Sequence, residues 1–566
     1  MLIFAAASMM FALLIGNILH EFEVSFISES MVIILIGYVL GIILPTRGGS
    51  VVSWAIGDVG VEEEGLAMAG VLNLFLLPII IFEAGWSMNH RAFVDLMLTI
   101  LTFAVLGTLI SMVVVGLLIN ATCDVHGVCS VRAAFTYAAL ISAVDPVATL
   151  ATYAHLQVDP LLNICVFGES VVNDAVAIVL FRVLNTGGLF TDTSFNVVSG
   201  RIASQTSLLL FGSVGLGVLL GFMLMSLGQR LITKVSRLTH STSNCVLFMF
   251  LSSFFIYSFA ERACGMSGII TVLFGAMFAS AFAKYQFSSE VTMFCAFTLK
   301  QAATLADMVV FLMVGITAVY CDVEGLVLGL LVCAFCLVGR AAAVFPLALL
   351  TNLCKEMYRR GQPPEKKLTL DWRKIFMMWH AGLRGGIALV LTLELGPWVD
   401  QEKPGTKDRL RNATVLVIVF FLLFFGGSTK ILLKWLKIPM EGSAEPLYVH
   451  HGRFWKGMHV VRDRVLRRLL MLNDDEKESS TLPHILADLA VVERALSTAT
   501  LPEVPPGAAV SIASRRGSDL LERSNITQRR PPGAQMVSLF GVQDPMHIDD
   551  ESGDESAEEE SESDSG

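Results

Sequence analysis

Three observations on the sequence predict an all-α membrane protein with about 13 transmembrane helices. Of its 566 residues, 54% are apolar and 16% are charged, and the mean hydropathy is +0.66. Apolar runs of about 18 residues or more, each long enough for a membrane-spanning helix, recur along the first three quarters of the chain. Two of these runs are broken by Pro or Gly beside charged side chains. Such breaks are tolerated at membrane depth only beside protein or water.

Thirteen candidate spans precede residue 437. The first lacks a basic segment before its apolar run, so we expect it to stay in the mature protein, with a cleaved signal peptide as the alternative. The spans centre on residues 2–20, 31–44, 65–86, 93–119, 133–154, 161–184, 207–227, 245–261, 265–282, 298–320, 325–350, 375–396 and 413–434.

Basic loops orient the predicted spans. With thirteen spans, three clusters of Lys and Arg fall on one side of the membrane, which the positive-inside tendency makes cytosolic. The C-terminal tail is then cytosolic, and the N-terminus is luminal or extracellular. The clusters are Arg230, Lys234 and Arg237; Lys355, Arg359, Arg360, Lys366 and Lys367; and Lys430, Lys434 and Lys437.

The composition divides the chain into a transmembrane domain (1–437), a cytosolic amphipathic helical region (438–500) and a disordered acidic tail (501–566). Between Phe454 and Leu472, apolar residues recur at helical spacing with arginines between them. That pattern suits membrane lipid, a cytosolic regulatory protein bound at about residues 450–475, or packing beneath the membrane domain.

The acidity of the chain belongs to its tail. The net charge is −10, and residues 541–566 carry 11 Asp and Glu without Lys or Arg, so residues 1–540 come to about +1. Such a tail is typically solvated. We expect no nucleic-acid partner.

The fifth predicted span contains the first polar site at membrane depth. Asp145 is followed by Pro146, which removes a backbone donor and disfavours helix at the residue before it. We therefore expect the helix to break there.

The sixth span, Phe167 to Leu180, holds the most informative residues. Ser170 and Asp174 lie at i and i+4 on one helical face, with Glu169 and Asn173 on a neighbouring stripe. An ionisable group in a span tends to face a water-filled pathway. A carboxylate there can hold a proton or a small cation, and hard cations prefer oxygen ligands such as these.

The twelfth span contains a second break, where Arg384 precedes Gly385 and Gly386. Spans five and twelve are seven apart, so two inverted six-span repeats would place the breaks at matching positions. Arg340, in span eleven, needs an anionic partner, and Glu169 is our candidate because an unpaired buried charge is strongly destabilising. We favour a structural role for this pair.

Loops on the non-cytosolic side leave two questions open. Asn120 and Asn412 begin sequons close to the membrane. Cys123 and Cys129 share one loop and could pair in an oxidising lumen, or remain free thiols.

These motifs resemble those of the monovalent cation/proton antiporter family, in its electroneutral sodium/proton exchanger branch. FGESVVNDA (167–175) is similar to the family's signature. FLLPIIIFEAGW (75–86), AVDPVA (143–148) and GLRGGIA (382–388) follow the family's order, and the resemblance covers about residues 30–437. The EAGW variant and the VDPVATL context are closer to the organellar (Golgi and endosomal) exchangers.

The resemblance implies a homodimer in an endomembrane or the plasma membrane, with inverted repeats that form a mobile core and a dimerisation domain. It also implies elevator-like alternating access. It makes Asp174 the ion- and proton-binding carboxylate and has Asp145, Ser170 and the Val144 carbonyl complete a Na+ or K+ site. Asn173 matches the electroneutral branch.

Four more residues acquire implied roles. Glu169 and Arg340 match a structural ion pair, and Arg384 matches the arginine of the second broken helix. Glu83 stands where some exchangers have aspartate, in a region tied to inhibitor and cation sensitivity.

The predicted function is electroneutral exchange of Na+ or K+ for H+, by a secondary transporter rather than an enzyme, with no soluble cofactor. Because Asn173 does not titrate, no second proton joins the cycle. A cation channel would need a pore-loop filter, which the sequence lacks. A transport-inactive scaffold would not need the Asp145, Asp174 and Arg340 set. Dispersed histidines without a nucleophile–base pair argue against a membrane enzyme.

Overall fold

The computed structural model of the chain describes residues 9–11, 13–15, 28–43, 72–88, 90–145, 147–186, 195–234, 242–287, 289–319, 321, 323–358 and 369–440. All of them belong to the first of two compact units, Met1–Glu476. The predicted amphipathic region beyond residue 440 and the acidic tail therefore lie outside the described residues, as do Pro146 and most of the first predicted span.

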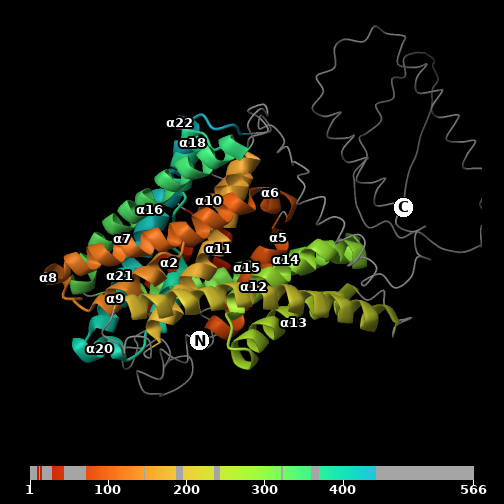
Figure 1. Cartoon of the computed structure of the whole chain (residues 1–566), viewed down its shortest axis with the longest axis horizontal. Coiled ribbons are helices and arrows are strands. Elements are labelled where there is room, and N and C mark those ends of the chain that lie inside the picture. The colour runs from red at the N-terminus through yellow and green to blue at the C-terminus, as the bar shows by residue number, and fades with distance from the viewer. Residues whose placement is uncertain are drawn as a thin grey trace, which may run out of the picture. The chain divides into compact units, whose positions relative to one another are not determined.

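Helices account for all regular structure in the described ranges, with no strand among them (Figure 1). The first half of the membrane domain holds α2 (Glu29–Ile43), the π-helical turn η1 (Leu72–Leu76), α5 (Leu77–Ser87), α6 (His90–Leu101), η2 (Thr102–Gly107), α7 (Thr108–Ala121), α8 (Cys123–His126), α9 (Val131–Ile141), α10 (Val147–His155) and α11 (Pro160–Asn185). The second half holds α12 (Phe195–Lys234), α13 (Thr242–Ser258), η4 (Phe259–Ala263), α14 (Gly268–Gln286), α15 (Ser289–Ala318), α16 (Val323–Tyr358), α18 (Trp372–His380), α19 (Gly386–Leu393), α20 (Trp398–Glu402), α21 (Thr406–Phe421), η5 (Leu422–Gly426) and α22 (Gly427–Trp435).

Seven helices in the described part of the chain are long and apolar enough to cross a membrane, and four shorter apolar helices accompany them. The seven are Leu96–Ala121, Pro160–Asn185, Gly200–Leu227, Ser243–Ala263, Glu290–Ala318, Gly325–Met357 and Thr406–Trp435. The predicted all-helical membrane fold is confirmed at this level, whereas the number 13 stays a prediction.

Several predicted spans are shorter than the helices that contain them. The seventh span was placed at 207–227, whereas α12 runs over 40 residues. The eleventh span likewise lies within a longer helix, α16, of 36 residues. The tenth span, at 298–320, overlaps α15, which begins earlier, at Ser289, and ends at Ala318. Hydropathy detects only the apolar stretch of a helix, so polar residues that continue the helix beyond it are missed.

Both predicted helix breaks are present. The fifth span stops at Ile141 and resumes at Val147, and the twelfth stops at His380 and resumes at Gly386. The sixth span is one continuous helix, α11. The start of this helix is set by Pro160 at its first position and by the Asp159 carboxylate, which caps it by accepting from Leu161 N at 2.8 Å.

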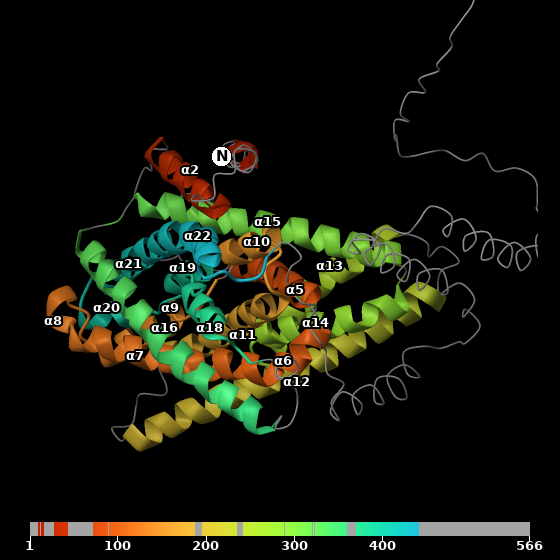
Figure 2. The ribbon, with the colours of Figure 1, turned by 90° about the horizontal axis from the view of Figure 1, so that it is seen from above.

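The helices form two bundles. The first bundle comprises α6–α11 and α16–α22, where α7 packs against α9 and α16, and α11 against α6 and α9. The second bundle comprises α2, α5 and α12–α15, where α14 packs against α5 and α12, and α15 against α2 and α5. Seen from above, α2 lies along α15 (Figure 2). Each bundle therefore combines segments from both halves of the membrane domain.

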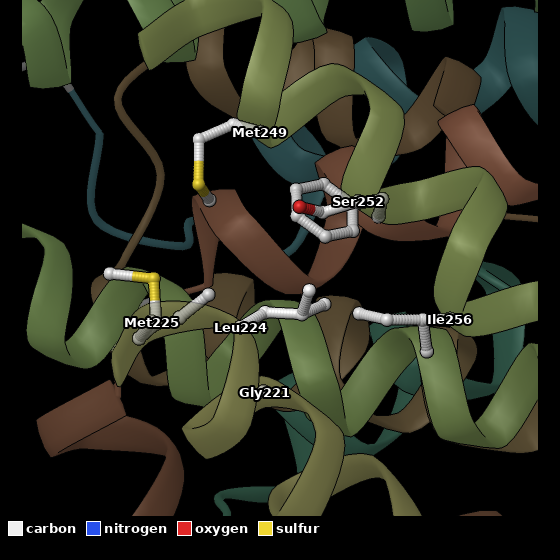
Figure 3. Close-up of a pocket in the computed structure, with 8 residues that line it drawn as sticks. Gly221, Leu224, Met225, Met249, Ser252 and Ile256 are labelled. Carbon is white, nitrogen blue, oxygen red and sulfur yellow. The ribbon is translucent and has the colours of Figure 1, made fainter. Parts of the chain in front are cut away.

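Small residues set the spacing inside the second bundle. A Cβ added to Gly315 of α15 would lie 2.9 Å from the Cα of Gly37 in α2, so the two backbones touch directly. Close backbone approach through small residues is how helices pack in lipid, where burial of apolar surface gives little driving force. α5, α12, α13 and α14 leave only a small apolar void of about 10 Å³, between residues such as Leu224, Met249 and Ile256 (Figure 3). That is about the volume needed by one water, so we assign no ligand to it.

Candidate ion-binding site

The two helix breaks lie side by side in the first bundle. The Asp145 backbone N–H donates to the Leu383 carbonyl at 3.1 Å. The Arg384 Nη1 donates to the Ala143 carbonyl at 2.8 Å. Each break thus supplies a hydrogen-bond partner to the backbone of the other, which satisfies polar groups that lipid could not.

Arg384 compensates the end of α9. Its side chain is 1% exposed, and the carbonyl that it binds follows the last turn of that helix. The carbonyls at a helix C-terminus carry partial negative charge, so a buried guanidinium is favourable there. Its charge also acts on Asp174.

Asp174 lies near the middle of α11, opposite the first break. The Val144 backbone N–H donates to Asp174 Oδ1 at 3.0 Å, and Ser170 Oγ donates to the Val144 carbonyl at 2.6 Å. Val144 is therefore bound by α11 at both its backbone N–H and its carbonyl. The two oxygens predicted as cation ligands, Ser170 Oγ and Val144 O, are bonded to each other in this structure.

Asp145 shares this space because its neighbours are small. A Cβ added at Gly385 would fall on the Asp145 carboxylate. The charges of Asp145, in the break after α9, and Asp174, in α11, interact. The structure thus brings together Asp145, Asp174, Ser170 and Val144 beside the second break.

Glu169 and Arg340 form a bidentate ion pair next to this site. Arg340 Nη1 donates to Glu169 Oε1, and Nη2 donates to Glu169 Oε2 at 2.9 Å and to the Met378 carbonyl at 2.9 Å. The pair joins α11, α16 and α18 within the first bundle.

Asn173 and Glu83 lie in different surroundings. Asn173 is 2% exposed and its Oδ1 has no hydrogen-bond partner among the described residues. Glu83 lies on α5 of the second bundle, and its charge interacts with that of Lys300 on α15. Gly386 contacts the second bundle, because a Cβ there would overlap the Val310 side chain of α15.

Comparisons with known proteins decide the family. The family model described as "Sodium/hydrogen exchanger, transmembrane" matches residues 9–435. The chain belongs to the sodium/hydrogen exchanger family. Sodium/hydrogen exchanger 8 of Mus musculus is 32% identical over 437 residues, which cover 75% of this chain and 70% of that protein. Sodium/hydrogen exchanger 5 of Homo sapiens is 31% identical over 75% of this chain and 44% of its own length.

A solved structure shows the same fold. It is that of the sodium proton antiporter MjNhaP1 from Methanocaldococcus jannaschii, with a TM-score of 0.55 and 14% identity over 76% of this chain and 97% of that one. This exchanger-family chain is thus a multi-pass integral membrane protein and a secondary transporter rather than an enzyme.

The structure also shows charged residues within the helices of the exchanger that were not predicted from the sequence. Asp307 of α15 interacts electrostatically with Asp145 and Glu83. Arg182 of α11 pairs with Glu261 of η4. Arg182 and Asp307 each interrupt an apolar run, so the rule that singled out Asp174, an ionisable residue inside a span, would have found them.

The structure answers part of the two questions about the sequons and the cysteine pair. Asn412 is 1% exposed and lies within α21, so in this conformation it is closed to a glycan. Asn120 lies in the last turn of α7. Cys123 and Cys129 are free thiols here.

Proposed function

We propose that the protein exchanges one Na+ or K+ for one H+ across a membrane without moving net charge. The observation that supports this most is the meeting of Asp145 and Asp174 at the crossing of two broken helices. Both carboxylates are partly buried, and their charges repel. A proton or a cation bound between them would relieve that repulsion, so the two compete for one place.

Oxygen ligands for a cation are available within the same crossing. Besides the carboxylates, Ser170 Oγ and the Val144 carbonyl lie together, and a cation could bind both once their mutual hydrogen bond opens. All four groups are oxygen donors, which suit hard cations. Na+ and K+ are both satisfied by such a set.

The stoichiometry follows from which groups can take up a proton. Asn173 cannot titrate, and Glu169 is bound by two hydrogen bonds from Arg340. Among the groups on α11 and the first break, that leaves the pair of aspartates as the exchangeable site, and a carrier that crosses only when occupied swaps one proton for one cation.

Alternating access is supported by the two bundles. The proposed ion site lies in the first bundle, whose helices come from predicted spans 4–6 and 11–13, and α2, α5 and α12–α15 of the second bundle come from predicted spans 2, 3 and 7–10. We propose that spans 4–6 and 11–13 are the matching halves of two inverted six-span repeats, and that the first bundle moves relative to the second. By the same resemblance we propose a homodimer in an endomembrane with its tail in the cytosol.

Purified protein in sealed liposomes tests this function. With a pH dye inside and the membrane potential clamped, addition of Na+ or K+ should drive proton flux that is indifferent to the potential. The cation that drives it identifies the substrate. Asp174→Asn should abolish the flux, whereas Asp371→Asn, at an exposed helix cap that asparagine preserves, should not.

Two outcomes contradict the proposal. Cation current without coupled proton flux would favour a channel. A folded preparation with no flux would favour a transport-inactive scaffold.

A further inference from the structure

An ion pair crosses between the two bundles near one end of α11. Arg182 lies eight residues after Asp174 on that helix, about 12 Å along its axis. Its Nη1 contacts Glu261 Oε1 of η4, and the side chains are 26% and 25% exposed. By the predicted topology, this is the non-cytosolic end of α11. The pair therefore ties the helix that carries Asp174 to the second bundle on that side.

Glu261 is held on the second bundle independently of Arg182. Its Oε1 also accepts from the Gly268 backbone N–H at 3.0 Å, at the first residue of α14. The N-terminus of a helix carries partial positive charge, so it keeps the carboxylate in place. A Cβ at Gly268 would lie 2.7 Å from Glu261 Cγ, which shows how closely the acid packs there.

A second acid interacts electrostatically with Arg182 from its own bundle. Glu394 follows the last residue of α19, and its charge acts on Arg182. The Asn185 side chain donates to the Glu394 carbonyl at 3.1 Å, which ties the end of α11 to that segment. Arg182 thus interacts with one acid on the second bundle, Glu261, and with one on its own first bundle, Glu394.

We propose that Arg182 is a gate residue that exchanges partners during transport. Paired with Glu261, it closes the non-cytosolic end while the site faces the cytosol. When the first bundle moves, Arg182 releases Glu261 and stays with Glu394. This inference rests on the proposed exchange, because only an alternating-access cycle requires the bundles to separate there.

Side-specific kinetics test the partner exchange. In liposomes with oriented protein, Glu261→Gln should lower the half-saturating Na+ or K+ concentration on the non-cytosolic face and raise it on the cytosolic face. Glu394→Gln should shift both in the opposite sense. We expect each half-saturating concentration to change by about two- to fivefold, as for loss of a partly exposed ion pair.

The matched control is an ion pair inside one bundle. Lys374 Nζ lies 2.7 Å from Asp159 Oδ2 at the other end of α11, and both residues belong to the first bundle. Asp159→Asn breaks this pair while keeping a helix cap. It should therefore leave the ratio of the half-saturating cation concentrations on the two faces unchanged.

Cross-linking provides a second readout. Arg182→Cys with Glu261→Cys, in a background whose exposed cysteines are serine, should lose exchange when bridged by a cleavable bifunctional thiol reagent and regain it after cleavage. The same reagent across Asp159→Cys and Lys374→Cys should leave exchange intact.

The outcomes separate this inference from the function it rests on. The gate would be contradicted if exchange persisted with positions 182 and 261 bridged, or if the half-saturating cation concentration shifted equally on both faces. Either result would leave the proposed exchange function intact. Absence of exchange before any bridge forms would instead overturn the proposed function.

Discussion

The two ion pairs on α11 differ in what they join. Glu169–Arg340 lies inside the first bundle, with side chains 2% and 7% exposed, and Arg340 also binds a backbone carbonyl. Arg182–Glu261 joins that bundle to the second, with side chains about a quarter exposed. Both pairs place charged side chains within helices of a membrane protein. The rule that an ionisable residue inside a span is a functional candidate therefore applies to both. Their surroundings indicate that the first holds a bundle together, whereas the second can open.

Breaking the buried pair should have the largest effect. Glu169→Gln leaves Arg340 buried without a counter-charge, which typically costs about 3–5 kcal/mol. We expect a large fall in thermal stability and in the yield of monodisperse protein in detergent. The double variant Glu169→Leu with Arg340→Met should recover much of the loss. A single variant that melts like the wild type would show that the pair is not structural.

A substitution at the proposed ion site should separate loss of transport from loss of structure. Gly385→Ala places a methyl group on the Asp145 carboxylate. Overpacking costs about 1–3 kcal/mol, and if Asp145 moves to relieve it, cation affinity should fall about tenfold or more. The half-saturating cation concentration in liposomes measures this.

The control for Gly385→Ala is Gly215→Ala on α12, where an added Cβ meets nothing within 4 Å. It should leave affinity unchanged. Unaltered affinity in Gly385→Ala would place the cation away from Asp145.

Opening the pair between the bundles should alter stability far less than breaking the buried pair. Glu261→Gln removes an ion pair that water partly screens, and such pairs contribute about 1 kcal/mol or less. Thermal unfolding in detergent should therefore differ little from wild type. A loss as large as that of Glu169→Gln would mean that both pairs are structural.

The smallest effect concerns the pH dependence of stability at His126, the last residue of α8. Burial lowers the pKa of His126 below 6.5, against a hydrogen bond to the Ile119 carbonyl. Its neutral ring accepts from the Val128 N–H at 3.2 Å. A lowered pKa in the folded state means that stability is present at neutral pH and is lost as pH falls through the lowered value.

Thermal melts between about pH 7 and pH 5 test the effect of His126. The melting temperature of the wild type should fall more steeply with acid than that of His126→Gln. Parallel curves would show that another group carries the dependence.

Much of the site could be predicted because it depends on local rules. Pro146 and the glycines beside Arg384 mark breaks that any helix would show, and helical spacing puts Ser170 and Asp174 on one face. The contacts between segments that are far apart in the sequence could not be predicted in this way. The Ser170–Val144 hydrogen bond and the fit of Asp145 against Gly385 depend on how α9, α11 and α19 approach one another.

Partner choice for the charges was only partly predictable. Arg340 needs an anionic partner at membrane depth, Glu169 was the predicted candidate, and the structure pairs the two. Glu261 is 79 residues away from Arg182 in the sequence, and only the folded structure brings the two side chains together. Helix lengths such as that of α12 were missed because their polar ends carry no hydropathy signal.

Proton release on cation binding tests the central claim most directly. Purified protein in weakly buffered detergent, with a pH dye, would receive NaCl or KCl, and choline chloride as the control. If one aspartate site alternates between proton and cation, release should saturate at no more than one proton per chain and vanish in Asp174→Asn. Release that survives Asp174→Asn, or that reaches two protons per chain, would contradict the account.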